Sequence, residues 1–193
     1  MSSFYMLCIF LLSLFLTEEA NAQIPDELAQ VTLSSDFETV SPGASGWLIT
    51  KVKVESGWHM YWKNAGQSGY PTTIEWQADG AELGPLQFPA PKAYEFLEMI
   101  IYVHEGEVVL LSEMRVDEDF DSENLEIRGK LSTLICNEEN CIPYDADLIL
   151  DIPLGKKSNP MPAESSLVSK AKASWPAIVP ADAQFSALLE EGS

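Results

Sequence analysis

Short segments that alternate apolar with polar residues, or that are rich in β-branched and aromatic residues, recur along the middle of the chain. Such segments are typical of β-strands that bury one face. Turn-forming pairs such as Pro42-Gly43 and Asp79-Gly80 separate them. The predicted strands are 31–33, 47–54, 58–62, 72–76, 99–103, 107–111, 125–135 and 147–152.

No long stretch before residue 160 has helical periodicity, so the fold class is predicted to be all-β. Short strands at this spacing, without helices between them, indicate an antiparallel sandwich of two sheets over residues 23–154. The proline-containing segment that follows reads as a linker. It leads into a short helix at 163–174 that ends before Pro176. Residues 181–191 are read either as a second helix or as a fragment of a longer element. We therefore expect residues 155–193 to form a linker and a partly helical C-terminal tail.

The first residues read as a signal peptide that directs export. The apolar run at 4–16 is shorter than the roughly 20 residues that span a bilayer. Small residues at Ala20 and Ala22 match a cleavage site, which gives a signal peptide at 1–22 and a mature chain that begins near Gln23. No Lys or Arg precedes the apolar run, so an uncleaved membrane anchor is the alternative.

Charge narrows the range of partners. The chain has 30 Asp and Glu against 11 Lys and Arg, a formal net charge of −19. A surface this acidic cannot neutralise phosphates, so nucleic acid and anionic lipid are not expected partners. Hydrophobic residues make up 46% of the chain, which is enough for the core of a single domain.

Two cysteines, Cys136 and Cys141, carry the candidate chemistry, because the third, Cys8, falls in the predicted leader. Positions this far apart can oppose each other across a hairpin with a four-residue loop. Opposed Cα atoms there lie about 4.5 Å apart, within the roughly 4.4–6.8 Å that a disulfide accepts. A bridge over so short a loop adds only about 2 kcal/mol. The pattern leaves two interpretations open, a structural staple and a redox centre.

The neighbouring charges oppose a strongly activated thiolate and are compatible with a disulfide that a partner's thiolate attacks. Glu138 and Glu139 lie between the cysteines and Asp145 follows them. Carboxylates beside a thiol raise its pKa and oppose thiolate formation. The spacing also differs from the Cys-x-x-Cys of thioredoxins, so no thioredoxin fold is expected.

An ordered set of motifs resembles the N-terminal domain of the DsbD family of thiol:disulfide interchange proteins. It comprises Tyr-Trp-Lys-Asn-Ala-Gly-Gln-Ser-Gly-Tyr-Pro at 61–71, Phe-Pro-Ala-Pro at 88–91, the segment 102–109, and Cys136 and Cys141 followed by Pro143. The resemblance covers roughly residues 28–182. The match is closest to the branch of the family that carries Tyr-Trp-x-Asn-Pro-Gly-x-Ser-Gly-x-Pro. One departure is Ala65, where that branch usually has proline.

The resemblance implies an immunoglobulin-like β-sandwich in the periplasm, or otherwise exported, that works as a protein-disulfide reductase type of interchange domain. Cys136 and Cys141 match the redox pair, and Cys141 would form the mixed disulfide. Phe96, with Glu95 beside it, lies in the stretch that caps the pair, and Tyr61 matches an aromatic residue that lines the site near His59. The implied partners are thioredoxin-like domains, as electron donor and acceptor, and a membrane electron-transfer protein.

Other interpretations of these residues stay open. Phe96 can equally be a core residue, and one of Tyr61 and Trp62 is expected to face the core because they alternate on a strand. No cofactor is expected, and His59 and His104 lack a third ligand at a spacing that suits zinc, so no metal is expected either. The alternative function is a non-enzymatic exported binding or chaperone-like β-sandwich whose disulfide is structural.

Overall fold

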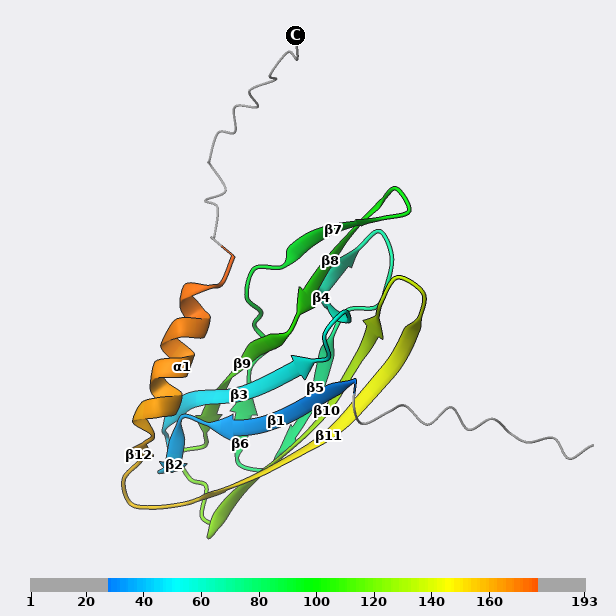
Figure 1. Ribbon diagram of the computed structural model, residues 1–193. Coiled ribbons are helices and arrows are strands. Elements are labelled where there is room, and N and C mark those ends of the chain that lie inside the picture. The colour runs from blue at the N-terminus through cyan, green and yellow to red at the C-terminus, as the bar shows by residue number, and fades with distance from the viewer. Residues whose placement is uncertain (1–27, 177–193) are drawn as a thin grey trace, which may run out of the picture.

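Two antiparallel β-sheets packed face to face make up most of the computed structural model, which describes residues 28–176 (Figure 1). The first sheet has the strand order β1-β3-β9-β6, with β1 (Ala29–Ser35), β3 (Ser45–Val54), β9 (Glu107–Val116) and β6 (Ala81–Leu83). The second has the order β11-β10-β4-β8-β7, with β11 (Cys141–Pro153), β10 (Asn124–Cys136), β4 (His59–Gly66), β8 (Met99–Glu105) and β7 (Lys92–Phe96).

Three shorter strands complete the sandwich. β5 (Thr73–Ala78) pairs with β10 along residues 127–132, while β4 pairs with the end of the same strand at residues 135 and 136. β12 (Asn159–Pro160) pairs with β2 (Phe37–Thr39). All of these pairings are antiparallel, so the predicted all-β antiparallel fold is confirmed.

Four strands were not anticipated from the sequence pattern: β2, β6, β7 and β12. They are short, and β7 has the composition Lys-Ala-Tyr-Glu-Phe, in which the apolar residues are too few to stand out. β11 is also longer than the predicted 147–152, since it begins at Cys141. Its first half alternates between half-buried and exposed residues, a weaker pattern than that of a strand with a fully buried face.

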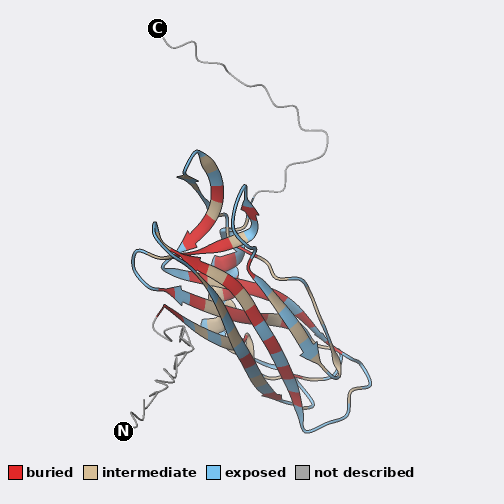
Figure 2. Cartoon of the chain, turned by 90° about the vertical axis from the view of Figure 1, so that its right-hand side faces the viewer, coloured by how far each residue is buried: buried red, intermediate tan, exposed pale blue. Residues whose placement is uncertain are grey.

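The core lies between the sheets and follows the alternation of the long strands, as the bands of buried residues in Figure 2 show. On β10, Leu125, Ile127, Leu131 and Ile135 are fully buried and point toward the first sheet. The hydrophobic clusters they belong to include residues of β3 and β9. Period-two patterning therefore orients β10 in the fold.

One end of the second sheet is buried on both faces. β4 begins with three buried residues in succession, His59, Met60 and Tyr61, and β10 ends with two, Ile135 and Cys136. Successive residues of a strand point to opposite faces, so something other than the first sheet must cover the outer side here. That cover includes residues of the β7–β8 hairpin, and it creates the site described below.

Helix α1 (Pro162–Ala173) packs on the outer face of the first sheet (Figure 1). Val168 and Ala171 are buried against Ile49 of β3 and Leu111 of β9. This is the short helix predicted at 163–174. The predicted signal peptide and the second helix at 181–191 lie outside the described residues. Between residues 28 and 176, no helix has the length and apolar character needed to cross a membrane.

Candidate functional site

A disulfide joins Cys136, the last residue of β10, to Cys141, the first residue of β11. The two residues are direct partners in the strand register, and their Cα atoms lie 4.1 Å apart. The predicted hairpin with a four-residue loop is therefore present. Asn137 closes it: its backbone N–H donates to the carbonyl oxygen of Asn140 at 2.9 Å, and its side-chain oxygen accepts from the backbone N–H groups of Glu139 and Asn140.

The two sulfur-bearing residues differ sharply in exposure. Cys136 is only 1% exposed, whereas Cys141 is an exposed residue. Cys136 belongs to a cluster with Tyr61, Ile101 and Val103 on the outer face of the second sheet. An approaching thiolate can therefore reach Cys141 from solvent, while Cys136 is shielded. A nucleophile that attacks a disulfide needs access to a sulfur along the disulfide axis, and Cys141 is the exposed residue of the two.

The β7–β8 hairpin brings Phe96 to the cluster that contains Cys136. Phe96 and Tyr94 are half-buried and pack against the cluster that contains Cys136. Glu95, between them, is exposed and lies on the opposite face of β7. The structure thus brings Phe96 to the cysteine cluster, and it leaves Glu95 pointing away from it.

Tyr61 is buried in the same cluster, and Trp62 packs on the sandwich core instead. A second layer holds Tyr61 in place. The Thr72 hydroxyl donates to the backbone oxygen of Tyr61 at 2.6 Å, and Gly69 passes so close to the ring that a Cβ there would lie 2.2 Å from a ring carbon. Gly69 has φ +96°, which glycine adopts without strain. Burial raises the pKa of the Tyr61 phenol.

The sequence did not predict that His59 lies next to the disulfide. It is the direct partner of Cys136 across β4 and β10, and Glu105 of β8 is its partner on the other side. The His59 ring lies 5.6 Å from the Tyr61 ring and 5.8 Å from the Tyr94 ring, measured between centroids. Only the strand register shows that His59 lies beside Cys136, because β4 and β10 are far apart in the sequence.

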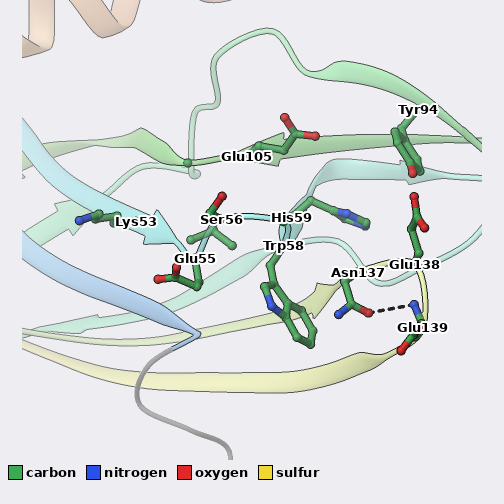
Figure 3. A pocket seen from close by; sticks show the side chains of 13 residues that line it. Lys53, Glu55, Ser56, Trp58, His59, Tyr94, Glu105, Asn137, Glu138 and Glu139 are labelled. Atoms are coloured by element: carbon green, nitrogen blue, oxygen red, sulfur yellow. Dashed lines mark hydrogen bonds between the residues drawn. The ribbon is translucent and has the colours of Figure 1, made fainter.

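An open cleft of about 900 Å³ lies beside the hairpin loop (Figure 3). His59 and Tyr94 line it, and so do the carboxylates of Glu55, Glu105, Glu138 and Glu139. Within the described part of the chain, no group of three His, Cys, Asp or Glu side chains is arranged to hold a metal ion. What the site does hold is a bridged cysteine pair with one accessible end, which suits thiol–disulfide exchange.

The family described as "Thiol:disulfide interchange protein DsbD, N-terminal" matches residues 26–153. The chain belongs to this DsbD N-terminal domain family. Its sandwich is the immunoglobulin-like fold of that family, and the site described here lies in the matched region. The disulfide, the fold and the family together place the chain among thiol:disulfide interchange domains.

Two solved structures are similar to this chain. The N-terminal periplasmic domain of ScsB from Proteus mirabilis is 26% identical, with a TM-score of 0.61 over 79% of this chain. The match spans 57% of that chain. The DsbD N-terminal domain of Neisseria meningitidis, in the reduced form, is 20% identical over 74% of this chain and 98% of its own, with a TM-score of 0.43. Among curated protein sequences, none matches this chain.

Proposed function

We propose that this chain carries reducing equivalents outside the cytoplasm by cycling Cys136 and Cys141 between a disulfide and a dithiol. One thioredoxin-like domain donates electrons to it. Thioredoxin-like client oxidoreductases accept electrons from it. The observation that carries the proposal is the asymmetry of the pair, with Cys136 buried and Cys141 exposed. Membership of the interchange family and the periplasmic origin of the ScsB domain support it.

The exchange runs in two displacements. A donor thiolate attacks Sγ of Cys141, the bond between Cys141 and Cys136 breaks, and Sγ of Cys136 leaves with the electron pair. The donor's second thiolate then attacks the donor sulfur that is bonded to Cys141 in the mixed disulfide, and Sγ of Cys141 leaves as a thiolate. Two electrons have moved to this chain, the donor has become a disulfide, and two protons complete the dithiol. Transfer to a client is the same sequence in reverse.

Trapping of the mixed disulfide tests the proposal. Cys136→Ala leaves Cys141 free, and it should accumulate a covalent adduct with a thioredoxin-like domain that lacks its own resolving cysteine. Cys141→Ala is the matched control, and it should trap much less because Cys136 is shielded. Equal trapping by both variants would contradict the assignment of Cys141. Trapping by neither would leave a binding or chaperone-like sandwich with a structural disulfide.

A further inference from the structure

In the reduced protein, the Cys136 thiol carries a proton that it must lose before it can react. The thiolate, not the thiol, is the nucleophile in exchange, so Cys136 must lose a proton before it can attack the sulfur of Cys141 in a mixed disulfide. Cys136 is 1% exposed and lies among apolar side chains, Ile101 and Val103 included. A thiol in such surroundings holds its proton firmly, so the step needs an acceptor within reach.

His59 is placed to be that acceptor. Directly opposed residues on antiparallel strands share a face and have Cβ atoms about 4.5–5.5 Å apart. His59 and Cys136 are such a pair, on the face that also carries Cys141. His59 is 9% exposed, and its buried Nε2 has no hydrogen-bond partner among the described residues. A buried polar atom without a partner in a folded protein calls for an explanation, and catalysis is one.

The groups around His59 leave its imidazole neutral and able to accept. Burial lowers its pKa, and Glu105 of β8 opposes that shift. Glu105 is itself paired with Lys92 of β7, while Tyr94 of β7 packs on the ring. The same cleft is lined by Lys53 and Glu55 at the end of β3, and by Glu138 and Glu139 of the hairpin loop.

Tyr61, a second titratable side chain beside Cys136, is a poor acceptor. Burial raises the pKa of its phenol, so it keeps its proton at neutral pH. Glu138 and Glu139 are exposed on the hairpin loop and line the same open cleft as His59. His59 is therefore the neutral base beside the buried thiol.

We propose that His59 accepts the proton of Cys136 when Cys136 resolves a mixed disulfide, an inference that rests on the proposed redox function. As the proton passes to Nε2 of His59, Sγ of Cys136 bonds to Sγ of Cys141. The bond between Cys141 and the partner sulfur breaks, and the partner leaves as a thiolate with the electron pair. The imidazolium then gives its proton to that thiolate or to water. In the reverse direction, protonated His59 supplies the proton to Cys136.

A small aromatic disulfide, dithiobis-nitrobenzoate, tests this without a protein partner. All variants carry Cys8→Ser so that only two thiols react. In stopped-flow, the reduced chain should release a first coloured thiolate when Cys141 attacks. A second follows when Cys136 resolves, at a rate independent of reagent concentration. His59→Gln should slow the second phase on the order of a hundredfold at neutral pH and leave the first within about twofold.

The pH profile separates proton transfer from packing. The wild-type second phase should show a plateau around neutral pH, where neutral His59 is the base. His59→Gln should lack the plateau and rise with hydroxide concentration. His59→Phe keeps a ring against Tyr61 and Tyr94, and it should behave like His59→Gln. His104→Gln is the matched control, because it removes the other buried imidazole and should leave both phases unchanged.

If both folded His59 variants keep the wild-type rate and plateau of the second phase, the role of His59 is overturned while the proposed cycling stands. If one His59 variant fails to fold, the other variant decides. Absence of the plateau in the wild-type protein also overturns the role of His59. A wild-type chain that shows no second phase at all would overturn both this inference and the proposed cycling.

Discussion

Cys136 and Cys141 belong to one bond but have different surroundings, and single residues account for the difference. Tyr61, Ile101 and Val103 bury Cys136, while the hairpin loop leaves Cys141 open to solvent. Phe96 packs on the same cluster from the β7–β8 hairpin yet is only half-buried. We propose that a ring in that position shields the disulfide more than it stabilises the fold.

Phe96→Ala should therefore speed reduction of the disulfide by dithiothreitol severalfold. The loss in free energy of unfolding should stay well below the roughly 3–5 kcal/mol of a fully buried phenylalanine. Phe88→Ala is the matched control, since Phe88 is buried in the main core and should show that full cost. Reduction rates and urea midpoints measured on both variants decide the role. A Phe96→Ala variant as unstable as Phe88→Ala, with no faster reduction of its folded form, would make Phe96 a core residue.

The sequence predicted the disulfide hairpin better than it predicted the surroundings of the hairpin. The spacing of Cys136 and Cys141 is enough to place them opposite each other, because a short loop leaves few registers. His59 and Tyr94 meet the hairpin through strand pairings between distant segments, and no local pattern encodes those. The long alternating strands were likewise predictable, whereas β7 was not, because its pairing with β8 outweighs its weak local pattern.

At the scale of elements, the β7–β8 hairpin turns under strain. Phe96 pairs with Met99, so Leu97 and Glu98 form a two-residue loop, with φ values of 48° and 64°. A two-residue turn with both residues left-handed is the type I′ geometry that Asn-Gly favours. Leu97 is also 76% exposed, so burial does not compensate for the conformation.

Replacing both residues, Leu97→Asn with Glu98→Gly, should stabilise the chain by about 1 kcal/mol, because it removes a left-handed conformation from two side chains. Urea unfolding at constant pH measures the gain. Leu97→Ala is the control, since it removes the exposed side chain but keeps the left-handed backbone, and its stability should not rise. A double variant less stable than wild type would contradict the turn assignment.

At the scale of the whole molecule, the sandwich contains a buried base that makes its stability depend on pH. His104 is 6% exposed, and burial lowers its pKa to about 4. Its ring stacks on Phe88, and its Nε2 has no hydrogen-bond partner among the described residues. The unfolded chain protonates this histidine near its ordinary pKa of about 6.5, so between these values the unfolded state binds more protons.

Stability should therefore fall as the pH falls from about 6.5 to about 4, and His104 should contribute about 3 kcal/mol of that loss. Above pH 6.5 the contribution is fully present. His104→Phe keeps a ring against Phe88 and removes the titrating group, so its free energy of unfolding should depend less on pH over this window. Urea titrations of both proteins across the window test this, and identical pH slopes would rule out His104 as the cause.

We expect the fold as a whole not to depend on the disulfide. The bridge closes a short loop, which adds only about 2 kcal/mol, and neither cysteine belongs to the core clusters between the sheets. A domain that stays folded in both redox states can exchange electrons repeatedly. A protein that needs its disulfide to stay folded would lose its structure each time the disulfide was reduced.

The reduction potential of the Cys136–Cys141 pair shows whether this disulfide exchanges or is structural. The purified chain with Cys8→Ser is equilibrated in thiol–disulfide buffers of graded potential, and the fraction of dithiol is read by alkylation and mass shift. Circular dichroism at each point checks that the reduced form stays folded. We predict a potential above about −300 mV with the β-sheet spectrum retained, as for a disulfide that exchanges. A potential below about −300 mV would contradict the account and leave a structural disulfide.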